Sequence, residues 1–326
     1  MATVSGSLRR LVLAPSLASV GFSGRGFAIE MNEATRRMEA VPQSVVCGFE
    51  WGIETRGLDE LERRLELIEP DLRGFAYEGA AMALTVLDAT AGGTRTRDLL
   101  SGRGSRHLLL AYIGVGFAMA RLPRMLWRKV LPDLEASIFH PTMCWLAVDG
   151  YGFDLAYFGK RRWIDRQEVP KPYPWQGAPE YFLRAVDQGI GRALWFVHGG
   201  RPANVSPAVG AFAAHRRADL WAGVGLAAAF AGGCATDELA ALALAAGEYR
   251  ADLSVGCVFA VRARALAGHT PPHTEAAARA LTGAGLDELV EIADTTAVGE
   301  GTADEPAYER WRQRIKQRTH AIEPAV

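Results

Sequence analysis

The sequence predicts an all-α protein in which duplicated helical hairpins stack into a compact helical-repeat domain. Two apolar segments with internal glycines, at residues 107–122 and 220–233, align when one is shifted by 109 residues. The segments before them, 74–88 and 186–200, align at the nearly equal shift of 112 residues. Repeats of helix pairs are typical of helical-repeat architectures. No alternation of apolar and polar residues persists over the length of a strand, which favours the all-α class.

The two apolar segments resemble membrane helices but are too short to span a bilayer. The uncharged run from 108 to 120 falls short of the roughly 20 residues that the hydrocarbon layer requires. The run from 220 to 236 is also short and holds four glycines. We expect central helices that are apolar on every side because other helices surround them. Their glycines either let helices cross closely or leave room for a ligand, and the sequence does not separate these alternatives.

The chain is expected to follow the repeat in four parts that share one continuous core. The first part, 1–56, is an N-terminal arm and helix. The second, 57–159, is the first half of the repeat and opens with an amphipathic helix at 57–74. The third, 160–180, holds four prolines and is the expected connector. The fourth, 181–326, is the second half with the C-terminal helices.

Composition excludes several classes of protein. Apolar residues make up 49% of the chain and charged residues 22%, which suffices for a buried core. The formal net charge is -1, so nucleic acid is not an expected partner. Four scattered cysteines form no disulfide framework, which favours a reducing compartment, and we expect a cytoplasmic protein without a transmembrane span. The start of the chain, Arg9-Arg10 followed by an apolar run, imitates a secretory signal, but Pro15 interrupts it.

Familiar catalytic and cofactor motifs do not occur in a supporting context. Gly189 and Gly191 form a G-x-G pattern, but no strand precedes it, so a dinucleotide site is not expected. A proline pair between His269 and His273 prevents both from lying on one helical face, and no metal site is predicted. The segment "FHPTMC" places His140 near Cys144, for which a buried structural thiol is favoured over a nucleophile. The sequence assigns no cofactor.

Two polar clusters are harder to interpret. Residues 147–159, "AVDGYGFDLAYFG", suggest a tight loop before a helix, and "HRRADLW" at 215–221 directly precedes an apolar run. In the favoured interpretation Asp187 and Asp219 are helix N-caps. In the alternative, acidic, arginine and tyrosine groups face an apolar cleft and perform proton transfer.

Several blocks of the sequence resemble a known family. The blocks "RGFAYEGAAMAL", "LLLAYIGVGFAMARL", "LAVDGYGFDLAYF", "DQGIGRALWFV", "RRADLWAGVGLAAAFAGG" and "YERWRQRI" are similar to the DUF1702 family, found largely in actinobacterial gene clusters. The start of the chain also resembles that family's ordinary beginning, which weakens the case for a signal peptide. Members of this kind accompany iterative polyketide synthases that make enediyne cores. The resemblance implies a role in enediyne biosynthesis when a polyene matures into the cyclic warhead, and it supplies no established active site.

The resulting hypothesis is an accessory protein that encloses a small hydrophobic polyketide intermediate, a polyene, and cyclises it if it is catalytic. The expected catalytic residues are Asp149, Tyr151 and Asp187 for proton transfer and Arg192 and Arg217 as anion or carbonyl stabilisers. The expected ligand-binding residues are Tyr77, Glu78, Tyr112, Gln188, Trp195, Asp219 and Trp221.

The rival hypothesis is a non-catalytic helical-repeat scaffold for a partner enzyme of the same gene cluster. A third possibility, membrane association during assembly, is disfavoured by the short apolar runs. The aromatic residues discriminate between the first two: ligand binding requires them inside, whereas a scaffold requires an exposed apolar groove.

Overall fold

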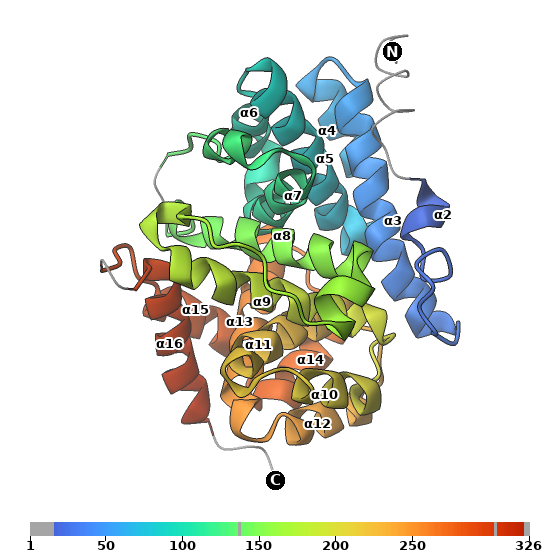
Figure 1. Cartoon of the computed structure of the whole chain (residues 1–326), viewed down its shortest axis with the longest axis vertical. Helices are drawn as coiled ribbons and strands as arrows, with labels where there is room; N and C mark the ends of the chain where they lie inside the picture. The colour runs from blue at the N-terminus through green and yellow to red at the C-terminus, as the bar shows by residue number, and fades with distance from the viewer. Residues whose placement is uncertain (1–15, 136–137, 303–304, 323–326) are drawn as a thin grey trace. The chain divides into compact units, whose positions relative to one another are not determined.

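The computed structural model describes residues 16–135, 138–302 and 305–322, and these residues form helices and no β-strand (Figure 1). The predicted all-α class is confirmed. Two compact units can be distinguished: unit 1 contains the described residues up to Phe27 and Glu39–Tyr151, and unit 2 contains Ala28–Met38 and the described residues from Gly152 onward. The signal-like segment around Arg9 lies outside the described residues.

Unit 1 consists of short connecting helices around longer buried ones. Two of its helices, α3 and α8, continue into unit 2. The elements in chain order are α2 (Leu17–Val20), α3 (Glu33–Glu54), α4 (Leu58–Glu66), α5 (Pro70–Ala91), α6 (Arg95–Ser101), the 3-10 helix η1 (Arg103–His107), α7 (Leu108–Arg121), the 3-10 helices η2 (Arg124–Lys129) and η3 (Thr142–Cys144), and α8 (Trp145–Phe158).

The amphipathic segment at 57–74 forms two helices. Its first part is α4, and Pro70 occupies the first turn of α5, where a proline lacks no required hydrogen bond. Leu61 and Leu65 of α4 are buried in a cluster with Tyr77 of α5 and Leu99 of α6. The apolar spacing therefore correctly marked the buried face, and Pro70, expected near the end of one helix, instead begins the next helix.

Unit 2 begins with an irregular segment and continues as a series of helices. Prolines in the predicted connector leave only the π-helical turn η4 (Arg161–Asp165) and the 3-10 helix η5 (Trp175–Gly177) before the next α-helix. The following elements are α9 (Pro179–Val197), α10 (Pro202–Gly210), α11 (Ala214–Ala231), α12 (Thr236–Ala245), the 3-10 helix η6 (Gly247–Tyr249), α13 (Arg250–Ala267), α14 (Pro272–Thr282), α15 (Leu286–Thr296) and α16 (Ala307–His320).

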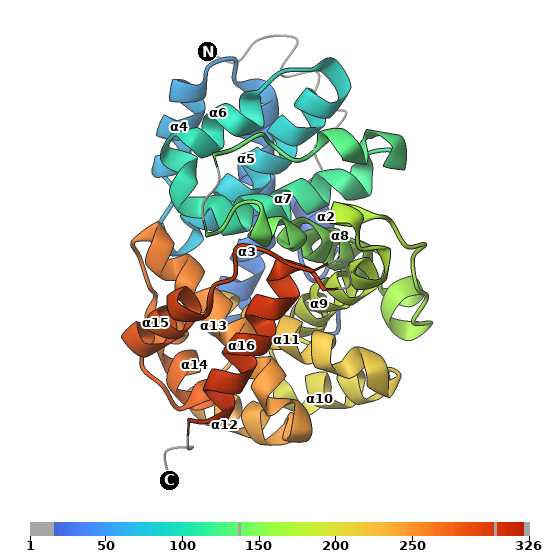
Figure 2. The same cartoon turned by 90° about the vertical axis from the view of Figure 1, so that its left-hand side faces the viewer.

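Helix α11 is the centre of unit 2. It contacts α9 and α13, while α14, α15 and α16 pack against α13 (Figures 1 and 2). Residues 219–225 of α11 are all buried, as are residues 252–261 of α13. Helices that are apolar around most of their circumference are stable in water only when other helices cover them, as here.

Glycines set the spacing between the central helices. A Cβ added to Gly223 of α11 would lie 1.9 Å from the backbone oxygen of Gln188 in α9. Reciprocally, a Cβ on Gly191 of α9 would lie 2.0 Å from the backbone oxygen of Leu220 in α11. Each glycine thus faces the carbonyl three residues before the other glycine. The two backbones come so close that no side chain fits between them.

The same reciprocal contact recurs in both units. In unit 1 the reciprocal glycine contact joins α3 to α5 and α7 to α8. In unit 2 it joins α9 to α11, as described above, and also α11 to α13. The further pairs are Gly48 with Gly79, Gly116 with Gly150, and Gly225 with Gly256. Of the two roles that the sequence left open, these glycines serve close helix crossing and do not leave room for a ligand.

The glycine-rich segment at 147–159 was predicted to form a tight loop. It instead forms most of helix α8 and the residue after that helix. Its Gly150 faces the backbone oxygen of Ile113 in unit 1, and its Gly152 faces that of Val186 in unit 2. Helix α8 therefore belongs to the same series as α7 and α9. The glycines were mistaken for loop residues because the close crossings that require them cannot be seen in one segment alone.

The series has a shorter interval than the duplication visible in the sequence. Successive central helices carry Gly79, Gly114, Gly150, Gly191 and Gly223, which are 35, 36, 41 and 32 residues apart. The shift of 109 to 112 residues spans three of these intervals. Among the described residues, no helix combines the length and apolar character needed to cross a membrane.

Candidate functional site

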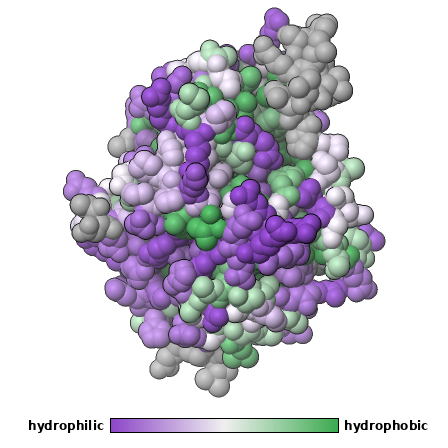
Figure 3. All heavy atoms as spheres, viewed as in Figure 1, coloured by the Kyte–Doolittle hydropathy of each residue, from purple (hydrophilic) through white to green (hydrophobic). Residues whose placement is uncertain are grey.

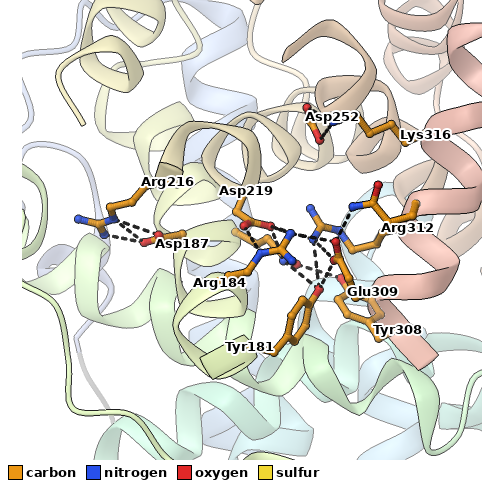
Figure 4. A network of polar contacts seen from close by, with 12 residues as sticks. Tyr181, Arg184, Asp187, Arg216, Asp219, Asp252, Tyr308, Glu309, Arg312 and Lys316 are labelled. Carbon is orange, nitrogen blue, oxygen red and sulfur yellow. Dashed lines mark hydrogen bonds and ion pairs between the residues drawn. The ribbon is translucent and has the colours of Figure 1, made fainter. Parts of the chain in front are cut away.

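A buried group of polar side chains joins three helices of unit 2 (Figure 4). Helix α9 contributes three of them, α11 contributes one, and α16 contributes three from its first two turns. We call this group the ionic cluster; its members are Tyr181, Arg184, Gln188, Asp219, Tyr308, Glu309 and Arg312.

Two arginines and two carboxylates form the centre of the ionic cluster. Arg184 contacts Asp219 at 2.8 Å and Glu309 at 2.9 Å. Arg312 contacts the same two carboxylates, at 2.8 and 2.7 Å. The side chains of Asp219 and Glu309 are each 2% exposed and that of Arg312 is 5% exposed, whereas Arg184 reaches solvent. The formal charges of these four groups cancel, which is the condition under which buried charges are tolerated.

Neutral side chains complete the hydrogen bonding of the cluster. The hydroxyl of Tyr181 donates to Glu309 at 2.7 Å and accepts from Arg312 at 3.1 Å. Gln188 donates to Asp219 at 3.0 Å, and its oxygen accepts from the hydroxyl of Tyr308 at 3.2 Å. Each carboxylate therefore has both arginine and uncharged donors, and the geometry of α16 on α9 and α11 is specified from several directions.

Electrostatics keeps the carboxylate of Glu309 ionised. Burial alone would raise the pKa of Glu309, but the guanidinium groups of Arg312 and Arg184 lower this pKa to about 2. Burial raises the pKa of Tyr181 well above its ordinary value, so its hydroxyl keeps its proton. Glu309 is consequently ionised at neutral pH, and the ionic cluster positions α16 on α9 and α11.

Two further ion pairs flank the cluster (Figure 4). Arg216 of α11 donates to both carboxylate oxygens of Asp187, at 2.5 to 3.1 Å. Lys316 of α16 donates to both oxygens of Asp252 at 2.8 Å. Burial raises the pKa of Asp187 and of Asp252, and the opposing effect of each cation only partly offsets it. These pairs extend the contact between the helices on either side of the cluster.

The predicted capping roles of two aspartates are wrong. Asp187 lies in the middle of α9, which begins at Pro179, and Asp219 lies inside α11, which begins at Ala214. Both carboxylates bind arginines of neighbouring elements instead of the N–H groups at a helix start. Arg217 contacts the C-terminal end of helix α10. It donates to the backbone oxygen of Gly210, the last residue of that helix, and to that of Phe212, each at 2.8 Å.

Two of the predicted ligand-binding residues lie in contact with one another. The other predicted site residues are spread over both units. Gln188 and Asp219 contact one another inside the ionic cluster. The remaining predicted residues of unit 2 are Asp187, Arg192, Trp195, Arg217 and Trp221, and those of unit 1 are Tyr77, Glu78, Tyr112, Asp149 and Tyr151.

In unit 2, Arg192, Trp195 and Trp221 are buried among aromatic and backbone groups, whereas Arg217 is partly exposed. The guanidinium of Arg192 lies 4.8 Å from the ring centre of Phe153, a cation–π contact. The indole of Trp195 donates to the backbone oxygen of Gly232 at 2.7 Å. Trp221 is 3% exposed, between residues that form the glycine crossings of α11.

In unit 1, the predicted residues are also buried. Tyr77 stacks on His107 with ring centres 4.4 Å apart, and its hydroxyl donates to Glu66 at 2.9 Å. Glu78 and Asp149 are 3% and 1% exposed. Tyr151 meets the ring of Trp127 edge-on at 4.9 Å.

One predicted residue of unit 1 contacts a partly exposed histidine. The hydroxyl of Tyr112, in α7, lies within hydrogen-bonding distance of the Nδ1 atom of His140, which precedes η3. The two rings are nearly parallel, 11° apart. Cys144 interacts electrostatically with Tyr112. The sequence had already singled out His140 and Cys144, but as a possible histidine–cysteine pair and not as neighbours of Tyr112.

The structure describes no metal site. Within the described ranges, no three histidine, cysteine, aspartate or glutamate side chains are grouped to hold a metal ion. His273 lies in α14 and contacts the backbone oxygen of Phe230 at 3.1 Å, whereas His269 lies before that helix. The G-x-G pattern of Gly189 and Gly191 lies inside α9, where Gly191 contributes to a helix crossing.

Sequence reasoning missed most of the ionic cluster. Tyr181 and Arg184 stand near the start of α9, and their partners on α16 lie more than 120 residues away. A signal was present in "YERWRQRI", where Glu309 and Arg312 share a helical face with the apolar residues Tyr308, Trp311 and Ile315. Charged residues on the apolar face of a helix indicate buried ion pairs.

The fold and the cluster define an all-α protein of glycine-crossed helices with a buried, charge-balanced contact between α9, α11 and α16. Residues 4–319 match the family described as "Protein of unknown function (DUF1702)". The chain therefore belongs to the DUF1702 family. Comparison with curated proteins and with solved structures finds no match.

Proposed function

We propose that this protein acts in enediyne polyketide biosynthesis, where it binds a hydrophobic polyene intermediate and promotes its cyclisation. Membership of the DUF1702 family over nearly the whole chain supports the proposal, because members of this kind accompany enediyne polyketide synthases. Other enzymes of the same biosynthetic cluster are the proposed source and recipients of the intermediate.

The observation that carries the binding role is the position of the aromatic residues. Tyr77, Tyr112 and Trp195 are fully buried and Trp221 is 3% exposed. A scaffold that holds a partner enzyme through these rings requires them on an exposed apolar groove. Their burial argues against a protein partner that docks on these rings, which is what the scaffold alternative requires.

The distribution of exposed apolar side chains agrees with this choice. On the face drawn in Figure 3, hydrophilic and hydrophobic residues are interspersed. The large apolar side chains exposed in the described part of the chain belong to different elements of both units: Leu17, Met31, Leu67, Met125, Ile138, Val169 and Leu244. Single exposed apolar residues are ordinary on protein surfaces and do not define a docking site.

The proposed catalytic residues remain those named from the sequence. Asp149 and Tyr151 are proposed for proton transfer, with Arg192 as the stabiliser of a developing anion. Asp187 and Arg217 belong to the same proposed set, although Asp187 already binds Arg216 and Arg217 already binds backbone oxygens. Removal of either of these two residues therefore affects folding as well as any chemistry.

The proposal is tested by incubating the purified protein with the polyene released by the polyketide synthase of the same gene cluster. The absorption spectrum reports the length of conjugation, and the product mass reports chemical change. Loss of conjugation or a new mass identifies an enzyme. A spectral shift with an unchanged mass restricts the role to binding. An unchanged spectrum and mass contradict the proposal and favour the scaffold.

Variants separate catalysis from binding. Asp149→Asn, Tyr151→Phe and Arg192→Met change the functional group with little change in volume. Loss of a general acid or base reduces turnover about 100-fold or more. Arg37→Met is a matched control because Arg37 lies on the surface, in a largely exposed pair with Glu33. Turnover by all three variants at the rate of the control removes these residues from the proposed catalytic set.

A further inference from the structure

Helices α15 and α16 pack beside one another on α13 and expose faces of opposite charge (Figures 1 and 2). The indole of Trp311 in α16 donates to the backbone oxygen of Ala293 in α15 at 2.9 Å, which holds the two helices together. We call the charged residues on the solvent-facing side of α15 the acidic stripe, and those of α16 the basic stripe. The acidic stripe consists of Asp287, Glu288 and Glu291, and the basic stripe of Arg310, Arg314 and Arg318.

Helical spacing places like charges next to one another within each stripe. The three arginines follow one another at intervals of four residues, and Asp287 and Glu291 are also four residues apart. Residues at this interval are neighbours on a helix surface, where like charges destabilise the helix. A second surface of opposite charge relieves this repulsion in both helices at once.

Residues of the same chain do not supply that opposite charge. Arg310 donates to a backbone oxygen at 3.1 Å, whereas Arg314 and Arg318 form no ion pair with any described residue. Asp294, the next acid along α15, is bound by Arg262 of α13 at 2.7 Å. The acidic stripe itself forms no ion pair in the described part of the chain. Both stripes therefore present charge that the fold does not neutralise.

Helix dipoles account for only part of the two stripes. Asp287 and Glu288 lie in the first turn of α15, and Arg318 lies in the last turn of α16, where the dipole favours these signs of charge. Glu291 and Arg314 lie in the middle of their helices, where the dipole gives neither sign an advantage. The dipole therefore does not explain these two residues.

We propose that α15 and α16 form the interface of a homodimer, in which the acidic stripe of one copy lies on the basic stripe of its partner. A two-fold axis that runs between the two helices makes both contacts at once, because each copy offers the same pair of stripes. An anionic membrane or an acidic protein would be attracted by the basic stripe and repelled by the acidic stripe beside it. Among the described residues, none of the exposed large apolar side chains belongs to α15 or α16, so this face offers a bilayer nothing to insert.

Sedimentation velocity of the full chain tests the dimer without any variant. The Debye length is about 30 Å at about 0.01 M salt and about 3 Å at about 1 M salt, so exposed charges attract one another far more strongly at low salt. We expect dimers at the lower salt concentration and monomers at the higher one. A monomer at both concentrations, or a dimer at both, overturns the inference.

Charge reversal tests which surface forms the dimer. Arg314→Glu/Arg318→Glu reverses the net charge of the basic stripe, and Asp287→Arg/Glu291→Arg reverses that of the acidic stripe. At low salt we expect each variant alone to dimerise at least about tenfold more weakly than wild type, because stripes of like charge meet. An equimolar mixture of the two variants should recover a dimer, because each acidic stripe again meets a basic one. This recovery also shows that both variants are folded.

Arg128→Glu/Lys129→Glu is the matched control, since it changes the net charge of the chain as Arg314→Glu/Arg318→Glu does, at two exposed residues of η2 in unit 1. We expect the control to dimerise as wild type does. Arg314→Gln/Arg318→Gln, which removes the charges without reversing them, should weaken the dimer to a smaller extent. Equal weakening in the control and the stripe variants, or a mixture of folded variants that recovers no dimer, overturns the inference. The dimer does not depend on the proposed function, because it rests on surface charge alone.

Discussion

Replacing Gly223 by alanine tests the glycine crossings most severely. The new Cβ would lie 1.9 Å from the backbone oxygen of Gln188 and 2.7 Å from the backbone nitrogen of Arg192. Contacts below 3.0 Å essentially never occur for Cβ atoms, so α9 and α11 must separate by about 1 Å. The neighbouring atoms are backbone, which cannot turn aside as a flexible side chain can.

The magnitude follows from two opposing effects. Alanine favours a helix over glycine by about 1 kcal/mol. A gap of about 1 Å removes a quarter to a half of the dispersion energy of the contacts that it opens. For one buried side chain of the size of leucine, the lost part is roughly 2 to 4 kcal/mol. Several side chains line the interface between α9 and α11. The net expectation is a loss of at least about 3 kcal/mol in the free energy of unfolding.

Urea unfolding followed by circular dichroism measures this change. Gly210→Ala is the matched control: Gly210 is the last residue of α10, and an added Cβ meets nothing within 4 Å. We expect the control to be as stable as wild type or slightly more stable. Adding Gly191→Ala to Gly223→Ala costs less than Gly191→Ala alone, because the helices are already separated. A Gly223→Ala protein as stable as the control refutes close crossing as the role of these glycines.

The remaining predictions concern buried charges and thiols. The pKa of Glu309 is depressed in the folded protein, so its stabilisation is complete above its ordinary pKa of 4.5 and is lost as the pH falls toward 2. Between pH 4.5 and 2 the free energy of unfolding of the wild-type protein should therefore fall by about 3 kcal/mol more than that of Glu309→Gln, as measured by urea unfolding at a series of pH values. Parallel dependences of the two free energies on pH would contradict a depressed pKa for Glu309. Arg216→Met leaves Asp187 buried without its cation and should cost about 3 to 5 kcal/mol by thermal unfolding, with part recovered in Asp187→Leu/Arg216→Met; a stable single variant would show that the pair is dispensable. Cys257 is fully buried with a pKa raised to about 12 by burial, and we expect no reaction with an aromatic disulfide reagent until the protein unfolds; rapid labelling in the native state, located by mass spectrometry, would disagree.

The fold class was accessible to sequence reasoning because its causes are local, whereas close helix crossing was only one of two roles that the sequence left open for the glycines. Apolar runs without alternation indicate buried helices, and glycines repeated in them at nearly equal distances indicate similar contacts. The same reasoning mistook α8 for a loop, since helix propensity disfavours Gly150 and Gly152. The packing that requires these glycines involves Ile113 and Val186, which are distant in sequence.

The ionic cluster could be predicted only in part, because its partners are far apart along the chain. Asp219 and Arg312 are 93 residues apart, and Tyr181 and Glu309 are 128 residues apart. Asp219 was recognised as awkward beside an apolar run, but a helix start was the nearest local explanation. Local patterns identify residues that require a partner and do not identify the partner.

Equilibrium dialysis of the purified protein against the polyene of its own gene cluster tests the proposed function most directly. Bound polyene is measured by absorption, and its mass is determined after release. The proposed function predicts saturable binding of one polyene per chain, with a changed mass if cyclisation follows. Binding that does not saturate, or a protein compartment with no more polyene than the buffer, would contradict it.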